Sequence, residues 1–429
     1  MMRRGPATFF LAALAVGLVA CAGPVSAPPE ETIADPTVAD EPVEWAPCGA
    51  IQCGTFTVPV DHAGGEQSAG VLGLQLFRRP SATANAPILL LVGDRLSSDV
   101  VDATWGARAL AERAELTLGT AVRGFDVISV ALRGSAETPM PAGTEGIVGT
   151  LDVADDLELL RTEGLGSPRV RVLAWGDGAT AVAAWVMRRP SGIEAAVLAS
   201  PADPASSLRT QTEARIIAAD AAATWAVKWC ASHLACPVNA TPANTVDLLD
   251  ARINDGSAPE GVTRASLARA AEAALAAGSP NSLWNAIAEA ADRRGELLAG
   301  LAGRPPSEAD VRPLCRDTGA DLARTLVALH EAARPTYFMV GSVAERLAVC
   351  VSSTAPARAL GEVEENPSAV GASVMVIGSA SDPVSPVSIM RAMAKRNKWT
   401  WKPSPAVRHL VVGREEVPTT AAMAHLRGD

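Results

Sequence analysis

Residues 169–199 read RVRVLAWGDGATAVAAWVMRRPSGIEAAVLA, and this segment gives the strongest indication of the fold class. The runs at 169–175 and 194–199 are short and largely aliphatic, which is typical of buried strands. The segment at 178–189 between them has the composition and length of a helix, and Pro190 ends it. A strand, a helix and a second strand in succession indicate a parallel sheet that is covered by helices.

The same alternation extends along the chain in both directions. Further strands are predicted at 55–60, 71–78, 87–92, 125–132 and 373–378, and further helices at 103–118 and 150–163. The first two strands precede any helix and are expected to form an antiparallel edge. A weak strand near Val407 and a short final helix end the chain. The sequence therefore predicts the α/β class with a mostly parallel sheet.

Residues 202–360 interrupt this alternation with helical periodicity that is rich in Ala, Leu and Arg. Thr263-Arg264-Ala265-Ser266 and Ser307-Glu308-Ala309-Asp310 are candidate helix starts, because a hydroxyl group at the N-cap accepts a free backbone N–H. We predict a helical cap at 202–360, inserted into a core formed by 45–201 and 361–429. This layout is that of an α/β-hydrolase fold.

The N-terminus predicts export and lipidation. Residues 1–20 have two arginines followed by an uncharged run that is too short to span a bilayer, which indicates a signal peptide. Leu18-Val19-Ala20-Cys21 fits a lipobox, so Cys21 is expected to carry a diacylglycerol and to hold the protein on the outer face of the cell membrane. The alternative is ordinary cleavage nearby. Residues 21–44 contain five prolines and six acids and are predicted to form a flexible tether.

Charge and cysteine content exclude several classes. The net charge is −10, and loss of Arg3 and Arg4 makes it −12. Because the arginines are scattered among acids, we expect no nucleic-acid partner. Neither a metal nor a cofactor is expected, since the histidines and cysteines lack ligand spacing. Export favours disulfide bonds. Proximity in sequence predicts Cys48–Cys53 and Cys230–Cys236, which leaves Cys315–Cys350, although six cysteines permit other connectivities.

Several short motifs are spread over most of the chain from Trp45 to Leu410. They are Trp45-x-x-Cys48 and Cys53 followed by Val58-Pro59-Val60-Asp61; Phe125-Asp126-Val127 leading to Arg133-Gly134; Asp152-x-x-Asp155-Asp156-Leu157-Glu158 with Arg161 and Gly166; Trp229-Cys230 and Cys236-Pro237; and Asp382-Pro383-Val384-Ser385-Pro386 with Met393. Together they resemble the secreted α/β-hydrolase peptidases related to tripeptidyl aminopeptidases. The resemblance implies cleavage of short peptides by a serine, a histidine and an aspartate.

The resemblance places two members of this triad. Asp382 lies just beyond the strand at 373–378 and is the implied orienting acid, and His409 follows it as the implied base. The family usually has glycine next to this histidine, whereas Arg408 and Leu410 flank it here. Two alternatives stay open: Asp382 shapes a turn only, and His409 is an exposed histidine with no special role.

The nucleophile position departs from the family. A nucleophile elbow needs small residues two before and two after the nucleophile, and Ala174-Trp175-Gly176-Asp177-Gly178 then puts Gly176 where the serine belongs. In the family the helix after the elbow also ends in a proline, and counting back along the sequence from Pro190 gives the same register. Sliding the register by one makes Asp177 a carboxylate nucleophile, but Trp175 then occupies a flank that must be small. Ser135 and Ser200 lie at other strand ends and are poorly placed to substitute.

The oxyanion loop has also changed. The family's His-Gly-Gly-type loop is replaced by Leu91-Val92-Gly93-Asp94-Arg95-Leu96, in which Asp94 brings a negative charge toward the oxyanion site. The usual Asp-Pro before Arg133-Gly134 has become Ala131-Leu132. The missing serine, the altered glycine-rich loop and the missing Asp-Pro pair are three losses near one pocket. Together they indicate a degenerate member of the family.

Three functions are compatible with these residues. The first is a non-catalytic scaffold that binds a peptide, a lipid or an envelope protein under the cap. The second is an active hydrolase on short peptides or esters with a displaced nucleophile, for which Asp177 is the candidate. The third is a structural lipoprotein whose cap docks another protein. Trp225, Trp229 and Trp284 of the cap are expected either to line a ligand cleft or to form core.

Overall fold

The computed structural model describes residues 42–64, 70–94, 106–332, 341–352, 357–358 and 372–429. The predicted signal peptide, Cys21 and most of the tether lie outside these ranges, as does the predicted boundary between cap and core near 360. No helix in the described ranges is long and apolar enough to cross a membrane.

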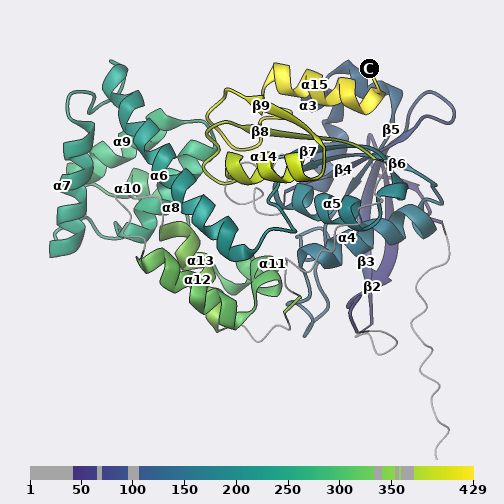
Figure 1. The fold of residues 1–429 in the computed structure, drawn as a ribbon, viewed down its shortest axis with the longest axis horizontal. Coiled ribbons are helices and arrows are strands. Elements are labelled where there is room, and N and C mark those ends of the chain that lie inside the picture. Colours follow the sequence, from purple (N-terminus) through teal and green to yellow (C-terminus); the bar gives the residue numbers. More distant parts are fainter. Residues whose placement is uncertain (1–41, 65–69, 95–105, 333–340, 353–356, 359–371) are drawn as a thin grey trace, which may run out of the picture. The chain divides into compact units, whose positions relative to one another are not determined.

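One sheet organises the part of the chain that the structure describes (Figure 1). Its order is β1-β2-β3-β5-β4-β6-β7-β8-β9. Pairing is antiparallel from β1 to β5 and parallel from β5 through β9. The strands are β1 (Ala46–Pro47), β2 (Gln52–Pro59), β3 (Val71–Arg79), β4 (Ile88–Val92), β5 (Asp126–Val130), β6 (Val170–Trp175), β7 (Ile193–Ala199), β8 (Ser373–Ser379) and β9 (Thr400–Ser404).

Helices cover both faces of this sheet. They are α2 (Ala107–Glu112), α3 (Ala114–Leu118), α4 (Thr150–Leu159), α5 (Gly176–Arg188), α14 (Val387–Arg396) and α15 (Glu416–Arg427). On β4, Leu90 and Val92 pack in the cluster that includes α4, α5 and α14, whereas Leu89 and Leu91 pack in the cluster that includes α2, α3 and α15. Burial on both faces explains why these strands are continuous apolar runs rather than alternating ones.

The strand order positions the site. β4 lies between β5 and β6 in the sheet. The strand after β4 is therefore added on one side of it and the next strand on the other side, so the strand order reverses at this point. Ligands of open α/β sheets bind beyond the carboxyl ends of the strands at such a reversal. With helices inserted between β7 and β8, the architecture is the α/β-hydrolase fold, which confirms the predicted fold class.

The segment between β7 and β8 forms a helical layer with its own apolar core. It contains α6 (Leu208–Ser232), α7 (Pro242–Asp255), α8 (Arg264–Ala276), α9 (Pro280–Ala291), α10 (Glu296–Ala302), α11 (Glu308–Thr318), α12 (Ala320–Ala332) and α13 (Gly341–Val351). Thr263 caps α8 as its sequence suggests, accepting the N–H of Ser266 at 3.0 Å. Trp284 is core: it is fully buried, and its indole N–H donates to Ala226 O at 3.0 Å.

All three expected disulfide bonds are present in the structure. They join Cys48 to Cys53, Cys230 to Cys236, and Cys315 of α11 to Cys350 of α13. Removing such bonds from a secreted domain is destabilising, since each restricts the unfolded chain.

The weak strand predicted near Val407 was wrong. The last strand is β9 at Thr400–Ser404, and residues 405–410 form a loop. Pro403 lies inside β9 and Pro405 follows it, so proline obscured the strand signal. Because β9 is at the edge of the sheet, the missing N–H of a proline is tolerated there.

The acidic run on α4 has a structural role. The buried carboxylate of Asp152 accepts hydrogen bonds from Arg316 Nε at 3.1 Å and from Arg358 Nη1 at 2.7 Å. The carboxylate of Asp156 accepts one from the buried Arg133 at 2.7 Å. Arg316 belongs to α11, so this network ties the helical layer to the sheet.

Candidate functional site

Asp382 and His409 meet at the carboxyl ends of β8 and β9. His409 Nδ1 lies 2.9 Å from Asp382 Oδ2, and both side chains are buried. Asp382 Oδ1 also accepts the backbone N–H groups of Val384 and Ser385 at 2.8 and 2.9 Å. Asp382 therefore shapes its turn and orients the imidazole at once. With 4% of its surface exposed, His409 is not the exposed histidine of the alternative interpretation.

The helical layer holds the backbone around His409. The His409 N–H donates to Ala276 O at the end of α8 at 3.0 Å, and Arg408 Nη2 donates to Ala277 O at 3.0 Å. Leu410 has φ +53°, a left-handed conformation that glycine adopts more easily. This explains how the loop keeps its turn without the glycine that is usual beside this histidine.

Gly176 occupies the elbow between β6 and α5. Its φ is +53°, whereas Trp175 before it is extended, so the chain turns sharply from strand into helix. A Cβ on Gly178 would lie 2.3 Å from Gly93 O, which explains why that flank must be small. The geometry matches the register in which Gly176 takes the nucleophile position and Asp177 is the residue after it.

The carboxylate of Asp94 fills the space that a nucleophilic side chain needs. A Cβ built on Gly176 would lie 2.4 Å from Asp94 Cγ and 2.6 and 2.8 Å from its two oxygens. Asp94 follows β4, whose neighbour in the sheet is β6, and only 5% of it is exposed. The sequence placed Asp94 near the oxyanion site, but nothing in it shows that the carboxylate enters the elbow.

Asp94 also contacts the two groups that a substrate of a serine hydrolase would use, which are the imidazole of His409 and the N–H of Asp177. Asp94 Oδ2 lies 3.8 Å from His409 Nε2, the nitrogen that faces away from Asp382. Asp94 Oδ1 accepts the Asp177 N–H at 3.4 Å. In this fold the N–H of the residue after the nucleophile binds the oxyanion, so the carboxylate stands where the substrate's negative charge would form.

The charges of these three groups depend on one another. Burial by itself lowers the pKa of His409, but the charge and hydrogen bond of Asp382 and then those of Asp94 raise it to about 9. Burial raises the pKa of Asp94, while hydrogen bonds from His409 and Asp177 outweigh this and hold it below the usual value. At neutral pH the imidazolium ion therefore lies between two carboxylates.

Arg215 of α6 extends this charged group from the helical layer. Its guanidinium is close enough to Asp382 and Glu272 for their charges to act on it, and burial lowers its pKa. Its Nε is buried without a hydrogen-bond partner within the described ranges. A buried donor of this kind has a high cost unless an acceptor reaches it.

The other candidate nucleophiles do not occupy the elbow position. Asp177 is the second residue of α5, outside the elbow position. In the described part of the chain, neither Ser135 nor Ser200 contacts His409: Ser135 Oγ accepts the Thr138 N–H at 3.2 Å, and Ser200 Oγ is buried with no partner. The described residues contain no cluster that could hold a metal ion.

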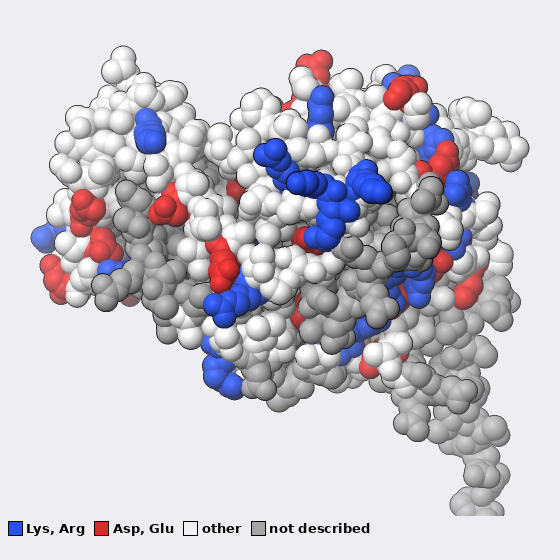
Figure 2. Space-filling view, viewed as in Figure 1, with Lys and Arg blue, Asp and Glu red and all other residues white. Residues whose placement is uncertain are grey.

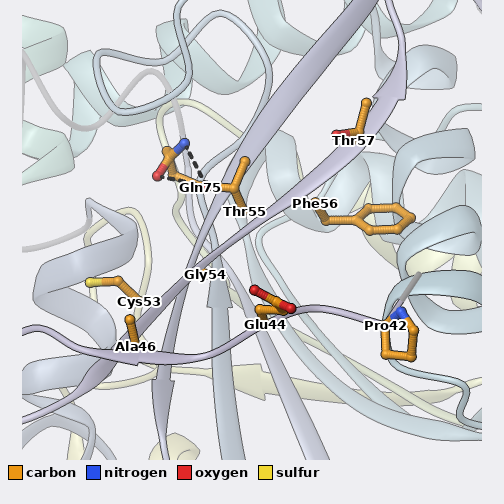
Figure 3. A pocket seen from close by; sticks show the side chains of 9 residues that line it. All are labelled: Pro42, Glu44, Ala46, Cys53, Gly54, Thr55, Phe56, Thr57 and Gln75. Carbon is orange, nitrogen blue, oxygen red and sulfur yellow. Dashed lines mark hydrogen bonds between the residues drawn. The ribbon is translucent and has the colours of Figure 1, made fainter. Parts of the chain in front are cut away.

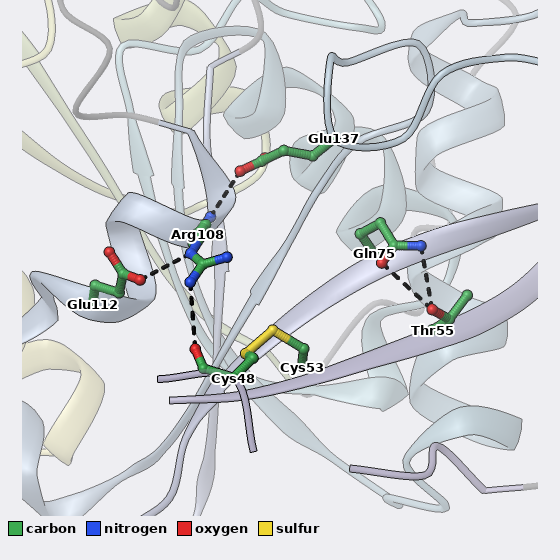
Figure 4. The surroundings of a disulfide bond; sticks show 7 residues. All are labelled: Cys48, Cys53, Thr55, Gln75, Arg108, Glu112 and Glu137. Carbon is green, nitrogen blue, oxygen red and sulfur yellow. Dashed lines mark hydrogen bonds and ion pairs between the residues drawn. A yellow bond between two sulfur atoms is a disulfide. The ribbon is translucent and has the colours of Figure 1, made fainter. Parts of the chain in front are cut away.

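A cavity of about 430 Å³ lies elsewhere, at the antiparallel edge of the sheet (Figure 3). Thr55 and Gln75 form its polar side, with Gln75 Nε2 donating to Thr55 Oγ1 at 3.2 Å. The Cys48–Cys53 disulfide fixes the neighbouring turn, where Arg108 donates to Cys48 O at 3.3 Å (Figure 4). None of the triad positions lines this cavity, so the candidate site remains the elbow.

The fold and this site define the class of the protein as α/β-hydrolase-like. No family profile matches the chain. It is similar to the serine protease Hip1 of Mycobacterium tuberculosis and of Mycobacterium bovis, with 25% identity over 363 residues, or 68% of this chain and 67% of the relative.

Two solved structures are similar to the chain at low identity. The proline iminopeptidase of Mycobacterium smegmatis is 15% identical, with 87% of this chain and 98% of that chain covered at a TM-score of 0.45. The enol-lactonase of Burkholderia xenovorans is 12% identical, with 83% and 97% covered at a TM-score of 0.40.

Proposed function

We propose that this protein is a catalytically inactive α/β-hydrolase-like lipoprotein that binds a ligand between its helical layer and its altered elbow. The observation that carries the proposal is the carboxylate of Asp94 in the space of a nucleophile on Gly176. A lipid on Cys21 is proposed to anchor the protein on the outer face of the cell membrane.

Each requirement of serine hydrolysis is altered at this site. Acyl transfer needs a nucleophile, a neutral imidazole to take its proton, and free donors for the oxyanion. Here Gly176 has no side chain, His409 has a pKa of about 9, and the Asp177 N–H is bound to Asp94. Loss of a nucleophile alone slows such enzymes on the order of a millionfold.

The ligand is proposed to carry an anionic group. Arg215 is a half-buried cation whose buried Nε has no hydrogen-bond partner within the described ranges, and an anionic acceptor would satisfy it. Because the relative Hip1 is named a serine protease, we favour a short peptide with a free C-terminal carboxylate over a lipid or an envelope protein.

This preference is tested by thermal shift. N-acetyl-dialanine is expected to raise the midpoint of unfolding more than its C-terminal amide does, and the Arg215→Gln variant should respond equally to both. Equal shifts with the unaltered protein would exclude recognition of the carboxylate by Arg215.

The alternative of an active hydrolase with a displaced nucleophile makes a distinct prediction. Asp94 is the carboxylate that lies beside His409 Nε2, whereas Asp177 is not in the elbow position. Any true hydrolysis should therefore depend on Asp94 and His409 more than on Asp177.

The test is a turnover panel of chromogenic tripeptides, aminoacyl amides and short esters. The protein is compared with its Asp94→Asn, Asp177→Ala and His409→Ala variants. We expect no turnover above buffer in any of the four. Turnover that His409→Ala abolishes would contradict the proposal, and the two aspartate variants would then identify the nucleophile.

A further inference from the structure

The region that follows Asp382 has an unusual charge distribution. Residues 383–414 contain seven arginines and lysines and not one aspartate or glutamate, in a protein whose net charge is −10. The general pattern of arginines accompanied by acids therefore does not hold here. A long run of one charge sign on a folded domain is expected to act on a partner of the opposite sign.

The structure brings part of this run to one surface. Arg391 and Lys395 lie on α14, Lys398 follows the helix, and Lys402 lies on β9; all four side chains are exposed. We call these four residues the basic patch. Figure 2 shows lysine and arginine side chains gathered over the part of the surface where Figure 1 places α14 and β9.

The basic patch is not neutralised by the parts of the domain that the structure describes. Arg396 pairs with Asp203 at 2.8 Å and Arg408 pairs with Glu415 at 3.1 Å, so these two neighbours are already compensated. The four patch residues form no ion pair with the described part of the chain. Arg391 and Lys395 also stand one helical turn apart, a like-charge spacing that destabilises a helix.

Two aromatic residues lie within the same stretch. Trp399 and Trp401 are half-buried and pack against the core cluster on this side of the sheet. Cations beside tryptophan are typical of surfaces that rest on the headgroup layer of a bilayer.

We propose that the basic patch binds the surface of an anionic bilayer and so sets the orientation of the anchored domain. The inference rests on the proposed location of the protein at a membrane, but it does not depend on whether the elbow is inactive. The predicted tether carries six acids and would be repelled by such a bilayer, whereas the charge of the basic patch complements it.

The test is flotation with vesicles of phosphatidylcholine alone or with phosphatidylglycerol added. It uses the chain from Cys21 onward with Cys21→Ser, which carries no lipid. Binding is expected with phosphatidylglycerol only and should weaken with salt. The Arg391→Glu/Lys395→Glu/Lys402→Glu variant is expected to bind roughly a hundredfold more weakly.

The matched control is Lys228→Glu/Arg293→Glu/Arg294→Glu, which changes the net charge equally at exposed positions of the helical layer. This variant should bind nearly as well as the parent chain. The proposal is overturned if the parent chain does not float with phosphatidylglycerol, or if the control loses as much binding as the patch variant. Neither outcome changes the result expected from the turnover panel. The membrane-binding proposal and the proposed function can therefore be rejected independently of each other.

Discussion

At the scale of single residues, Asp94 links all the changes at the elbow. A side chain at position 176 would displace the Asp94 carboxylate from its present position, since a Cβ there would lie 2.4 Å from Asp94 Cγ. We therefore propose that Gly176 and Asp94 are two parts of one altered site. Asp94 also replaces a substrate oxyanion as the partner of the Asp177 N–H.

The Asp94→Asn variant tests the electrostatic part of this argument. Removing one of the two negative charges should lower the pKa of His409 from about 9 toward its ordinary value. The measurement is an NMR titration of the histidine ring protons. An unchanged midpoint would mean that Asp382 alone raises the pKa of His409.

The same groups predict how stability depends on pH. The pKa of His409 is higher in the folded than in the unfolded protein, so its contribution is complete below about pH 6.5 and is lost as pH rises through about 9. The free energy of unfolding should fall by on the order of 3 kcal/mol over this window. Denaturant titrations from pH 6 to 10 measure it, and Asp94→Asn should show a smaller fall.

At the scale of elements, the buried pairs between α4 and α11 hold the helical layer in place over the site. Arg316 and Asp152 are both buried and lie 3.1 Å apart. Burial raises the pKa of Asp152, and hydrogen bonds and charge from Arg316 and its neighbours lower it below the usual value. Asp152 is thus stabilised as a carboxylate only while its arginines remain.

The Arg316→Ala variant is expected to lose about 3–5 kcal/mol of stability, because it leaves buried charge without one of its partners. Urea unfolding measures the loss. The control is Arg209→Ala, which breaks the exposed pair with Glu213 and should cost less than about 1 kcal/mol. Equal effects of the two changes would contradict a supporting role for the α4–α11 network.

At the scale of the whole molecule, the sequence predicts the scaffold better than the site. Strands such as β4 and β6 were predictable because burial on both faces demands continuous aliphatic runs. The register of Gly176 was predictable because only small residues fit both flanks of the turn. β9 was misplaced because its proline suppresses the strand signal.

The rest of the site depends on contacts that no local pattern encodes. Asp94 reaches Gly176 only because β4 and β6 are neighbours in the sheet, although the two residues are far apart in the sequence. The backbone support of His409 by Ala276 likewise comes from the helical layer. The same holds for Arg215 of the helical layer, which lies close enough to Asp382 for that charge to act on it.

The central claim is that Asp94 occupies the place of a nucleophile in an otherwise intact elbow. The most direct measurement is covalent labelling by a fluorophosphonate probe, with the protein compared with its Gly176→Ser/Asp94→Gly variant and with the same variant carrying His409→Ala. We expect labelling of the double variant alone, at the introduced serine. Labelling of the unaltered protein, or a folded double variant that stays unlabelled, would contradict it.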